Sequence, residues 1–290
     1  MADIVGIYAA THTPVMLTLP DAIPSDDRET IYETFRALGR HIAQANPQTV
    51  VVISNDHLHN FFLDNFPAFC FGAADAYPTP IESWLNAEKR TLPGDPTLGA
   101  YLIGEAQAAS FDPSFSLHLT LDHGALTPLE LAELPHPVAI VPILVNCVQP
   151  PLPLMQRCLQ LGRFLGRALR AYEGLQRVAI LATGGLSHDV GTPRMGMVNE
   201  AFDREFLRLL GAGNDDALVQ YATEHVNEAG NGAEEIRNWL IAHGAAGGVA
   251  FDVFYYKAMP DWYTGIALVG WGANAVCSAG RPESKTTFVS

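Results

Sequence analysis

Four short apolar runs, each almost free of charged residues, constrain the fold of this chain more than any other feature. They are rich in β-branched residues and occupy residues 4–10, 49–54, 138–145 and 178–182. Strands that are buried on both faces have this composition, because neither face meets water. Between the runs lie segments whose apolar residues would line one face of a helix, namely Ile31, Phe35, Leu38 and Ile42, and later Leu159, Leu161, Leu165 and Leu169. The alternation predicts an α/β fold, a single domain with a central mostly parallel or mixed sheet flanked by helices.

The last third of the chain departs from this alternation. Three helical patterns are followed by two apolar segments, at residues 198–210, 215–225, 233–244, 249–256 and 263–271. We expect the two apolar segments to add strands to the sheet. Further on, periodicity is lost and small polar residues become frequent, which is typical of a flexible tail. We therefore expect one folded domain, residues 1–273, and a C-terminal tail, residues 274–290.

Composition and charge exclude several classes of function. Lys plus Arg number 17 and Asp plus Glu number 31, so the formal net charge is -14, which argues against a nucleic acid or an anionic membrane surface as partner. No apolar stretch reaches the roughly 18 residues of a membrane helix, and the first residues lack a signal-peptide pattern. The four cysteines show no zinc-finger or CxxC spacing. Reduced thiols in a cytoplasmic protein are the simplest interpretation.

Three histidines stand just beyond predicted strands. His12, His57 and His188 follow the first, second and fourth apolar runs. Ligands of open α/β sheets gather at the carboxyl ends of the strands, so these side chains could converge and form a metal site there. Any one of them alone would more often be a structural residue.

A carboxylate and a fourth histidine complete the set of candidates. Glu235 falls in the first turn of a predicted helix that opens at Asn231 and Gly232, where the helix dipole keeps a carboxylate ionised; simple compensation of that dipole is the alternative. His123 lies at another break between an apolar run and a polar segment. His59 repeats His57 at strand spacing and competes with it as a ligand. Two histidines and one carboxylate form an iron(II) site with open positions.

Seven short motifs, in order along nearly the whole chain, resemble those of the class III extradiol ring-cleavage dioxygenases, the group of the protocatechuate 4,5-dioxygenase β subunit and 2,3-dihydroxyphenylpropionate 1,2-dioxygenase. They are THTP, NDHLHNFF, FPAFCFG, LDHGALTPLE, TGGLSHDVGTPRMG, EEIRNWL and YYKAMPDWYTG. Each motif alone is short, whereas the ordered combination is highly specific.

The resemblance implies a role for each candidate. It implies that His12, His57 and Glu235 bind Fe(II), that His188 is the catalytic acid and base, and that His123 contacts substrate or oxygen. Glu235 is favoured over Glu234 because it stands four residues before Trp239, as in the family, and His59 is not a ligand position.

The final motif suggests where a substrate would bind. The resemblance implies that Thr264 and Tyr263 lie near the substrate pocket. Lys257 and Arg194 are candidates to meet a ring substituent, with plain surface charge as the alternative.

The resemblance also predicts the reaction and the partners. Residues 1–273 would be the catalytic domain of an extradiol dioxygenase that inserts both atoms of O2 into a catechol-type aromatic ring and opens it. A non-catalytic metal- or ligand-binding protein on the same fold and a zinc-dependent hydrolase are the alternatives. Some relatives require a small helical subunit, and this chain has no segment left over for one. We therefore expect a homo-oligomer or a complex with a small helical subunit.

Overall fold

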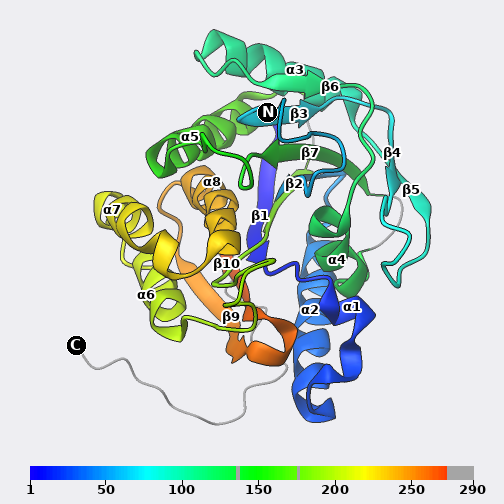
Figure 1. Ribbon diagram of the computed structural model, residues 1–290. Coiled ribbons are helices and arrows are strands. Elements are labelled where there is room, and N and C mark those ends of the chain that lie inside the picture. Colours follow the sequence, from blue (N-terminus) through cyan, green and yellow to red (C-terminus); the bar gives the residue numbers. More distant parts are fainter. Residues whose placement is uncertain (135–137, 175–176, 273–290) are drawn as a thin grey trace.

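A central sheet organises the molecule, and the computed structural model describes residues 1–134, 138–174 and 177–272. The sheet strands are β1 (Asp3–Ala10), β2 (Thr49–Asn55), β3 (Phe69–Gly72), β6 (Ser114–Ser116), β7 (Ala139–Val145), β8 (Arg177–Thr183), β9 (Phe251–Met259) and β10 (Thr264–Trp271). Their order is β6-β3-β7-β2-β8-β1-β10-β9 (Figure 1). A separate hairpin joins β4 (Ala76–Thr79) to β5 (Arg90–Pro93).

Parallel pairing confirms the α/β prediction. The four apolar runs form β1, β2, β7 and β8, and β2 pairs in parallel with both β7 and β8, while β8 pairs in parallel with β1. The sheet is mixed because β10 is antiparallel to β1 and β9, and β3 is antiparallel to β7. Every residue of β2 is buried, which explains its uninterrupted apolar composition.

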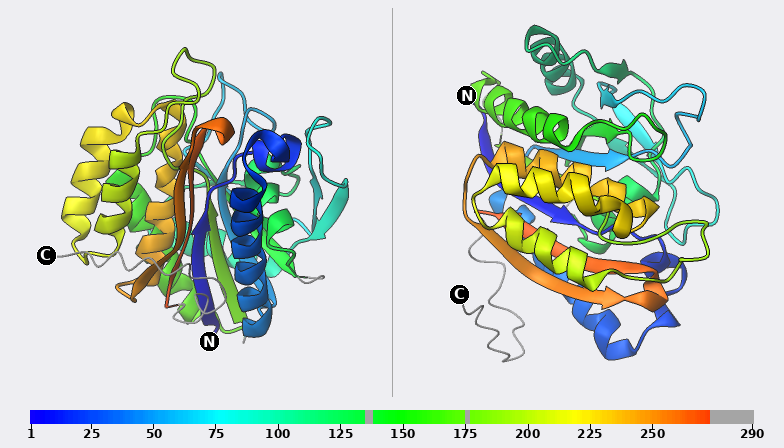
Figure 2. Two further views of the ribbon diagram at one scale, coloured as in Figure 1. Left: turned by 90° about the horizontal axis from the view of Figure 1, so that it is seen from below. Right: turned by 60° about the vertical axis from the view of Figure 1, so that its left-hand side comes forward.

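Helices cover both faces of the sheet. They are α1 (Val15–Thr18), α2 (Ser25–Ala45), α3 (Pro96–Ala108), α4 (His123–Leu131), α5 (Met155–Ala171), α6 (Glu200–Leu210), α7 (Asp215–His225) and α8 (Ile236–Ala246). Single turns of 3-10 helix lie at Pro20–Ala22 (η1), Val226–Glu228 (η2), Asn231–Glu235 (η3) and Pro260–Trp262 (η4). In Figure 2 the yellow and gold helices α6 to α8 lie across the sheet from the blue helix α2.

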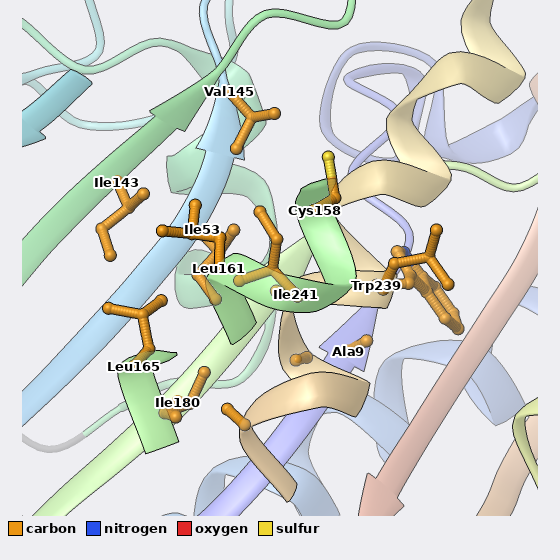
Figure 3. Packing of buried hydrophobic residues seen from close by; sticks show 14 of the residues in the cluster. Ala9, Ile53, Ile143, Val145, Cys158, Leu161, Leu165, Ile180, Trp239 and Ile241 are labelled. Atoms are coloured by element: carbon orange, nitrogen blue, oxygen red, sulfur yellow. The ribbon is translucent and has the colours of Figure 1, made fainter. Parts of the chain in front are cut away.

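Alternate residues of the strands pack into two hydrophobic cores, one on each face of the sheet. Val51 and Ile53 of β2 join the core beneath α5 and α8, whereas Val50 and Val52 face the core beneath α2. Figure 3 shows side chains of α5 and α8 packed on Ile53. Successive side chains of a strand point to opposite faces of the sheet, so the helices on each face pack against a different set of strand residues.

Helices α5 and α8 approach each other closely because glycine lies between them. A Cβ at Gly162 of α5 would lie 2.0 Å from the carbonyl oxygen of Ile241 in α8. Backbones this close cannot accept any side chain without moving apart. The close approach fixes α8 against the sheet, and with it Glu235, the residue just before α8.

The structure differs from the predicted helices and strands in a few places. The helix expected at 233–244 is divided into η3 and α8, and the short segments β3 to β6, α3 and α4 were not predicted. The expected tail, residues 274–290, lies outside the described residues. Among the residues described, no helix has the length and apolar character needed to cross a lipid bilayer.

Candidate functional site

The five candidate side chains come together at the carboxyl ends of adjacent strands. His12 follows β1, His57 follows β2 and His188 follows β8, and these three strands are neighbours in the order β2-β8-β1. His123 is the first residue of α4 and Glu235 the last residue of η3. The sheet therefore gathers residues that are more than 200 positions apart, such as His12 and Glu235, 223 positions apart.

Three of these residues, His12, His57 and Glu235, converge on one point, called here the cradle, which could hold a metal ion. Oε1 of Glu235 lies 3.2 Å from Nε2 of His12 and 3.3 Å from Nε2 of His57. Glu235 is only 4% exposed. Burial alone would raise its pKa, but the neighbouring imidazoles, His12 first, hold the pKa of Glu235 well below its ordinary value. Two nitrogens and one ionised oxygen thus meet at one point, the donor set of a mononuclear iron(II) or zinc site.

The outer nitrogen of each cradle histidine is held by a hydrogen bond. Nδ1 of His57 lies 3.0 Å from Oδ2 of Asp122, which also accepts a bond from the His57 main-chain N–H. Nδ1 of His12 lies 3.0 Å from the hydroxyl oxygen of Thr183, and that hydroxyl donates to Ser54. Both rings therefore carry the proton on Nδ1 and turn Nε2 to the cradle, the arrangement of histidines that bind metals.

Amide groups fix the carboxylate. Nδ2 of Asn55 lies 3.1 Å from Oε1 of Glu235 and 3.0 Å from Nε2 of His57, and Oδ1 of Asn55 accepts a bond from Asn238. The Gly185 N–H donates to Oε2 of Glu235 over 2.7 Å. Glu235 is thus oriented from both of its oxygens.

His123 stacks on His57. Their ring centroids lie 4.0 Å apart at an interplanar angle of 30°, and Nδ1 of His123 lies 2.6 Å from Oε1 of the buried Glu82. Burial, followed by the adjacent His57, lowers the pKa of His123 to about 4. His123 is therefore a neutral imidazole at neutral pH, with Nδ1–H given to Glu82.

Two alternative groups of ligands occur within the described residues. Nitrogens of His12, His57 and His123 lie within 4.8 Å of one another. The rings of His123 and His57 are stacked, and Nδ1 of each lies beside a carboxylate oxygen, of Glu82 and of Asp122. The second group combines His59, Glu82 and Asp122, but its two carboxylates already bind His123 and His57.

His188 faces the carboxylate from the opposite side. Its Nε2 lies 3.9 Å from Oε2 of Glu235, and its Nδ1 lies 3.0 Å from the carbonyl oxygen of Leu186. A Cβ at Gly232 would lie 2.0 Å from Nε2 of His188. The ring rests on Gly232, so only glycine fits at this position.

His59 does not share the direction of His57. Strand β2 ends at Asn55, and the carboxylate of Asp56 then accepts bonds from the N–H groups of His59, Asn60 and Phe61. The chain turns here, so the continued strand that would align the two histidines does not occur. Nε2 of His59 lies 3.4 Å from Glu82 instead.

The proposed substrate residues differ in their surroundings. Thr264 is buried, and its Oγ1 has no hydrogen-bond partner within the described part of the chain. Tyr263 precedes it in a left-handed conformation, with φ of 64°. Lys257 forms an ion pair with Asp27.

Arg194 is also engaged. Its side chain lies 3.1 Å from a carboxylate oxygen of Asp189 and donates to the carbonyl of Glu228. Both cations considered for a ring substituent thus already have anionic partners.

Trp84 was missed by the sequence analysis. It lies on the loop that carries Glu82, its ring centroid is 5.9 Å from that of His123, and it is 56% exposed. An exposed tryptophan beside buried polar residues is typical of a binding site, but the surrounding sequence has no periodicity that would place it there.

The family comparison matches most of the chain. Residues 6–267 match the family described as the catalytic LigB subunit of aromatic ring-opening dioxygenase. Three relatives are named 2,3-dihydroxyphenylpropionate/2,3-dihydroxicinnamic acid 1,2-dioxygenase. The protein from Photorhabdus laumondii is 27% identical over 91% of this chain and 96% of its own length. Those from Paraburkholderia xenovorans and Cupriavidus necator are 30% and 28% identical, over 76% and 91% of this chain and 83% and 97% of their own lengths.

One solved structure supports the fold. An uncharacterized protein from Escherichia coli K12 superposes with a TM-score of 0.61 at 17% identity, covering 92% of this chain and 99% of that chain.

Proposed function

The chain belongs to the LigB family, the catalytic subunits of aromatic ring-opening dioxygenases, and from this premise we propose that it is an Fe(II)-dependent extradiol dioxygenase. The reaction would insert both atoms of O2 into a catechol-type ring and open the ring. One observation carries the proposal: two Nε2 atoms and a buried carboxylate oxygen meet at 3.2 and 3.3 Å, with three neighbouring groups holding the ligands in place.

His12, His57 and Glu235 would hold the metal. Their charges leave a bound iron(II) ion with a net charge of about +1 and open positions, which suits a catecholate and O2. Iron supplies the means to acidify a catechol hydroxyl and to bring O2 next to the ring. The protein supplies the orientation, because Thr183, Asp122 and Asn55 leave the ligands little freedom.

His188 would move the proton. With Nδ1–H bonded to the Leu186 carbonyl, its Nε2 carries a lone pair and faces the site. Nε2 can accept the proton of a substrate hydroxyl and return it to a departing oxygen later in the reaction. Nε2 of the neutral His123 would accept a hydrogen bond from the substrate.

The ring itself would lie near Trp84 and Thr264. Trp84 offers an exposed aromatic face beside His123, and Thr264 contributes a buried hydroxyl without a partner among the described residues. A flat aromatic substrate fits such a mixture of an aromatic wall and a few polar groups.

Anaerobic reconstitution tests the proposal. The full chain would be loaded with Fe(II) without oxygen and mixed with catechol, protocatechuate, gallate, 2-aminophenol or 2,3-dihydroxyphenylpropionate before air is admitted. We expect oxygen uptake and a coloured ring-opened product with at least one compound. Protein loaded with Zn(II) is the matched control and should consume none. Full iron occupancy without oxygen uptake for any compound would favour a non-catalytic binding protein.

A further inference from the structure

Asp203 is a fully buried carboxylate beside the loop that carries His188. It lies in α6, has an exposed fraction of 0%, and accepts three hydrogen bonds. Oδ1 accepts from the Ser187 N–H over 2.8 Å, and Oδ2 accepts from the hydroxyls of Ser187 and Tyr256 over 3.0 and 2.9 Å. No Lys, Arg or His in the described ranges forms an ion pair with it. Burial raises the pKa of Asp203 to about 6 despite these three donors.

One peptide group connects Asp203 to His188. The Ser187 N–H that donates to Asp203 and the Leu186 carbonyl that accepts from Nδ1 of His188 belong to the same peptide plane. A peptide plane is rigid, so a bond that fixes its N–H also fixes the direction of its carbonyl. Because a carbonyl can only accept, the proton of His188 must lie on Nδ1 while this contact lasts.

The surrounding chain packs closely against the Asp203 carboxylate. A Cβ at Gly265 of β10 would lie 2.1 Å from Oδ2 of Asp203, so the strand passes directly beside the carboxylate. The main chains of Leu186 and Gly265 are hydrogen bonded, and the Asn199 N–H donates to Oγ of Ser187. The site's other side is fixed separately, since the Gly232 N–H donates to the His188 carbonyl.

We propose that Asp203 is a positioning residue that sets the tautomer and direction of the His188 ring through the Leu186–Ser187 peptide group. Asp203 forms hydrogen bonds with Ser187 and Tyr256, not with His12, His57 or Glu235. Its importance for turnover rests on the proposed function, whereas its effect on the His188 ring does not.

Asparagine at this position would disturb the arrangement while keeping the shape. If its oxygen still accepts from the Ser187 N–H, its amide group faces the two hydroxyls of Ser187 and Tyr256. Oγ of Ser187 already accepts from Asn199. Each hydroxyl then loses its acceptor and has to turn its O–H away to accept from the amide group, so the carboxylate no longer holds the Leu186–Ser187 peptide as firmly.

The first test observes the ring directly. In metal-free full-length protein labelled with 15N-histidine, we expect His188 of the wild type to carry its proton on Nδ1 only. Asp203→Asn should populate the Nε2 tautomer, seen as the ring nitrogen shifts of His188 moving toward each other. Asp215→Asn, which removes the carboxylate beside His243, is the matched control and should leave His188 unchanged.

Unchanged His188 shifts in a folded Asp203→Asn protein would overturn the proposal. Should this variant not fold, Tyr256→Phe removes only one of the three donors. It should move the same signals in the same direction by a smaller amount, and no movement in it overturns the proposal equally.

The second test is kinetic. In iron-loaded enzyme, Asp203→Asn should lower kcat about tenfold, with KM and iron content unchanged. In a His188→Ala background the same substitution should cause no further loss, because both act on one group. Independent losses that multiply in the double variant would contradict the proposal. If no substrate turns over, the proposed function fails, and the nuclear magnetic resonance result still decides the role of Asp203.

Discussion

The site has two sides that hold their histidines differently. On one side, His57 and His123 each give Nδ1–H directly to a buried carboxylate, Asp122 or Glu82. On the other side, His12 gives it to the Thr183 hydroxyl and His188 to the Leu186 carbonyl, both neutral acceptors. A carboxylate acceptor holds the ring by a charge-assisted hydrogen bond. A neutral acceptor orients the ring by an uncharged hydrogen bond.

This difference bears on the proposed roles of metal binding and proton transfer. The cradle takes one histidine from each side, His57 and His12, and Glu235 joins them. The residue proposed to gain and lose a proton, His188, stands on the neutral side: its Nδ1–H goes to the Leu186 carbonyl, and its Nε2 lies 3.9 Å from Oε2 of Glu235. Four predictions test this interpretation, from the largest expected effect to the smallest.

Removal of the shared carboxylate should abolish the centre. Glu235→Ala takes away the only anionic donor of the cradle, so we expect Fe(II) occupancy after gel filtration to fall below about a tenth of the wild type. Metal analysis by mass spectrometry measures it. Glu234→Gln is the control, since Glu234 forms an ion pair with Arg237 instead and should keep its iron. If the Glu235→Ala protein kept its iron, Glu235 would not be a metal ligand.

Removal of the proposed acid and base should separate the two roles. His188→Ala should keep iron and lose turnover by roughly 10²- to 10⁴-fold in kcat, as measured by oxygen uptake at saturating substrate. Turnover close to that of the wild type would show that His188 does not transfer the proton.

A third comparison sets two buried carboxylates against each other. Burial favours a raised pKa in both, but His57 keeps the pKa of Asp122 well below its usual range, whereas Asp203, which has no imidazole partner, has its pKa raised from 3.8 to about 6. The folded state therefore holds the Asp203 proton more tightly than the unfolded state, so this residue's destabilising effect is full above pH 6 and disappears as the pH falls toward 4.

The shift corresponds to on the order of 3 kcal/mol. The free energy of unfolding of the wild type, relative to Asp203→Asn, should rise by about this amount between pH 8 and pH 4. Urea denaturation at intervals of pH measures it. A difference that does not change with pH would show that Asp203 titrates as it does in water.

The smallest effects concern the acceptors behind the two cradle histidines. Asp122→Asn should weaken Fe(II) binding about 10- to 100-fold, and Thr183→Val by less than about tenfold, because only the first removes charge from behind a ligand. Competition with a chelator measures both affinities. Equal losses would mean that both acceptors merely orient their rings.

Much of the fold could be predicted because its central strands lie in the interior. Most residues of strands β1, β2, β7 and β8 are apolar, and that is what burial on both faces requires. The short segments β3 and β6 were missed because three or four residues are too few to show a period, and Figure 1 places them at the edge of the sheet.

The candidate site could be predicted only in part. The strand exits indicated where His12, His57 and His188 would meet, but Glu82 and Thr183 carry no local signal, since their role depends on a partner far along the chain. Asp203 looks like an ordinary acid in an amphipathic helix. His57 was preferred to His59 without knowledge of the turn capped by Asp56, which the sequence does not distinguish from a continuing strand.

Strand β1 lies between β8 and β10, which has a consequence for biosynthesis. Thr11, beside His12, is hydrogen bonded to Gly265, 254 positions away. A ribosome therefore releases the first cradle histidine long before the residues that enclose it, and contacts of such long range form slowly. If the cradle binds iron as proposed, metal capture would follow the closing of the sheet rather than guide it.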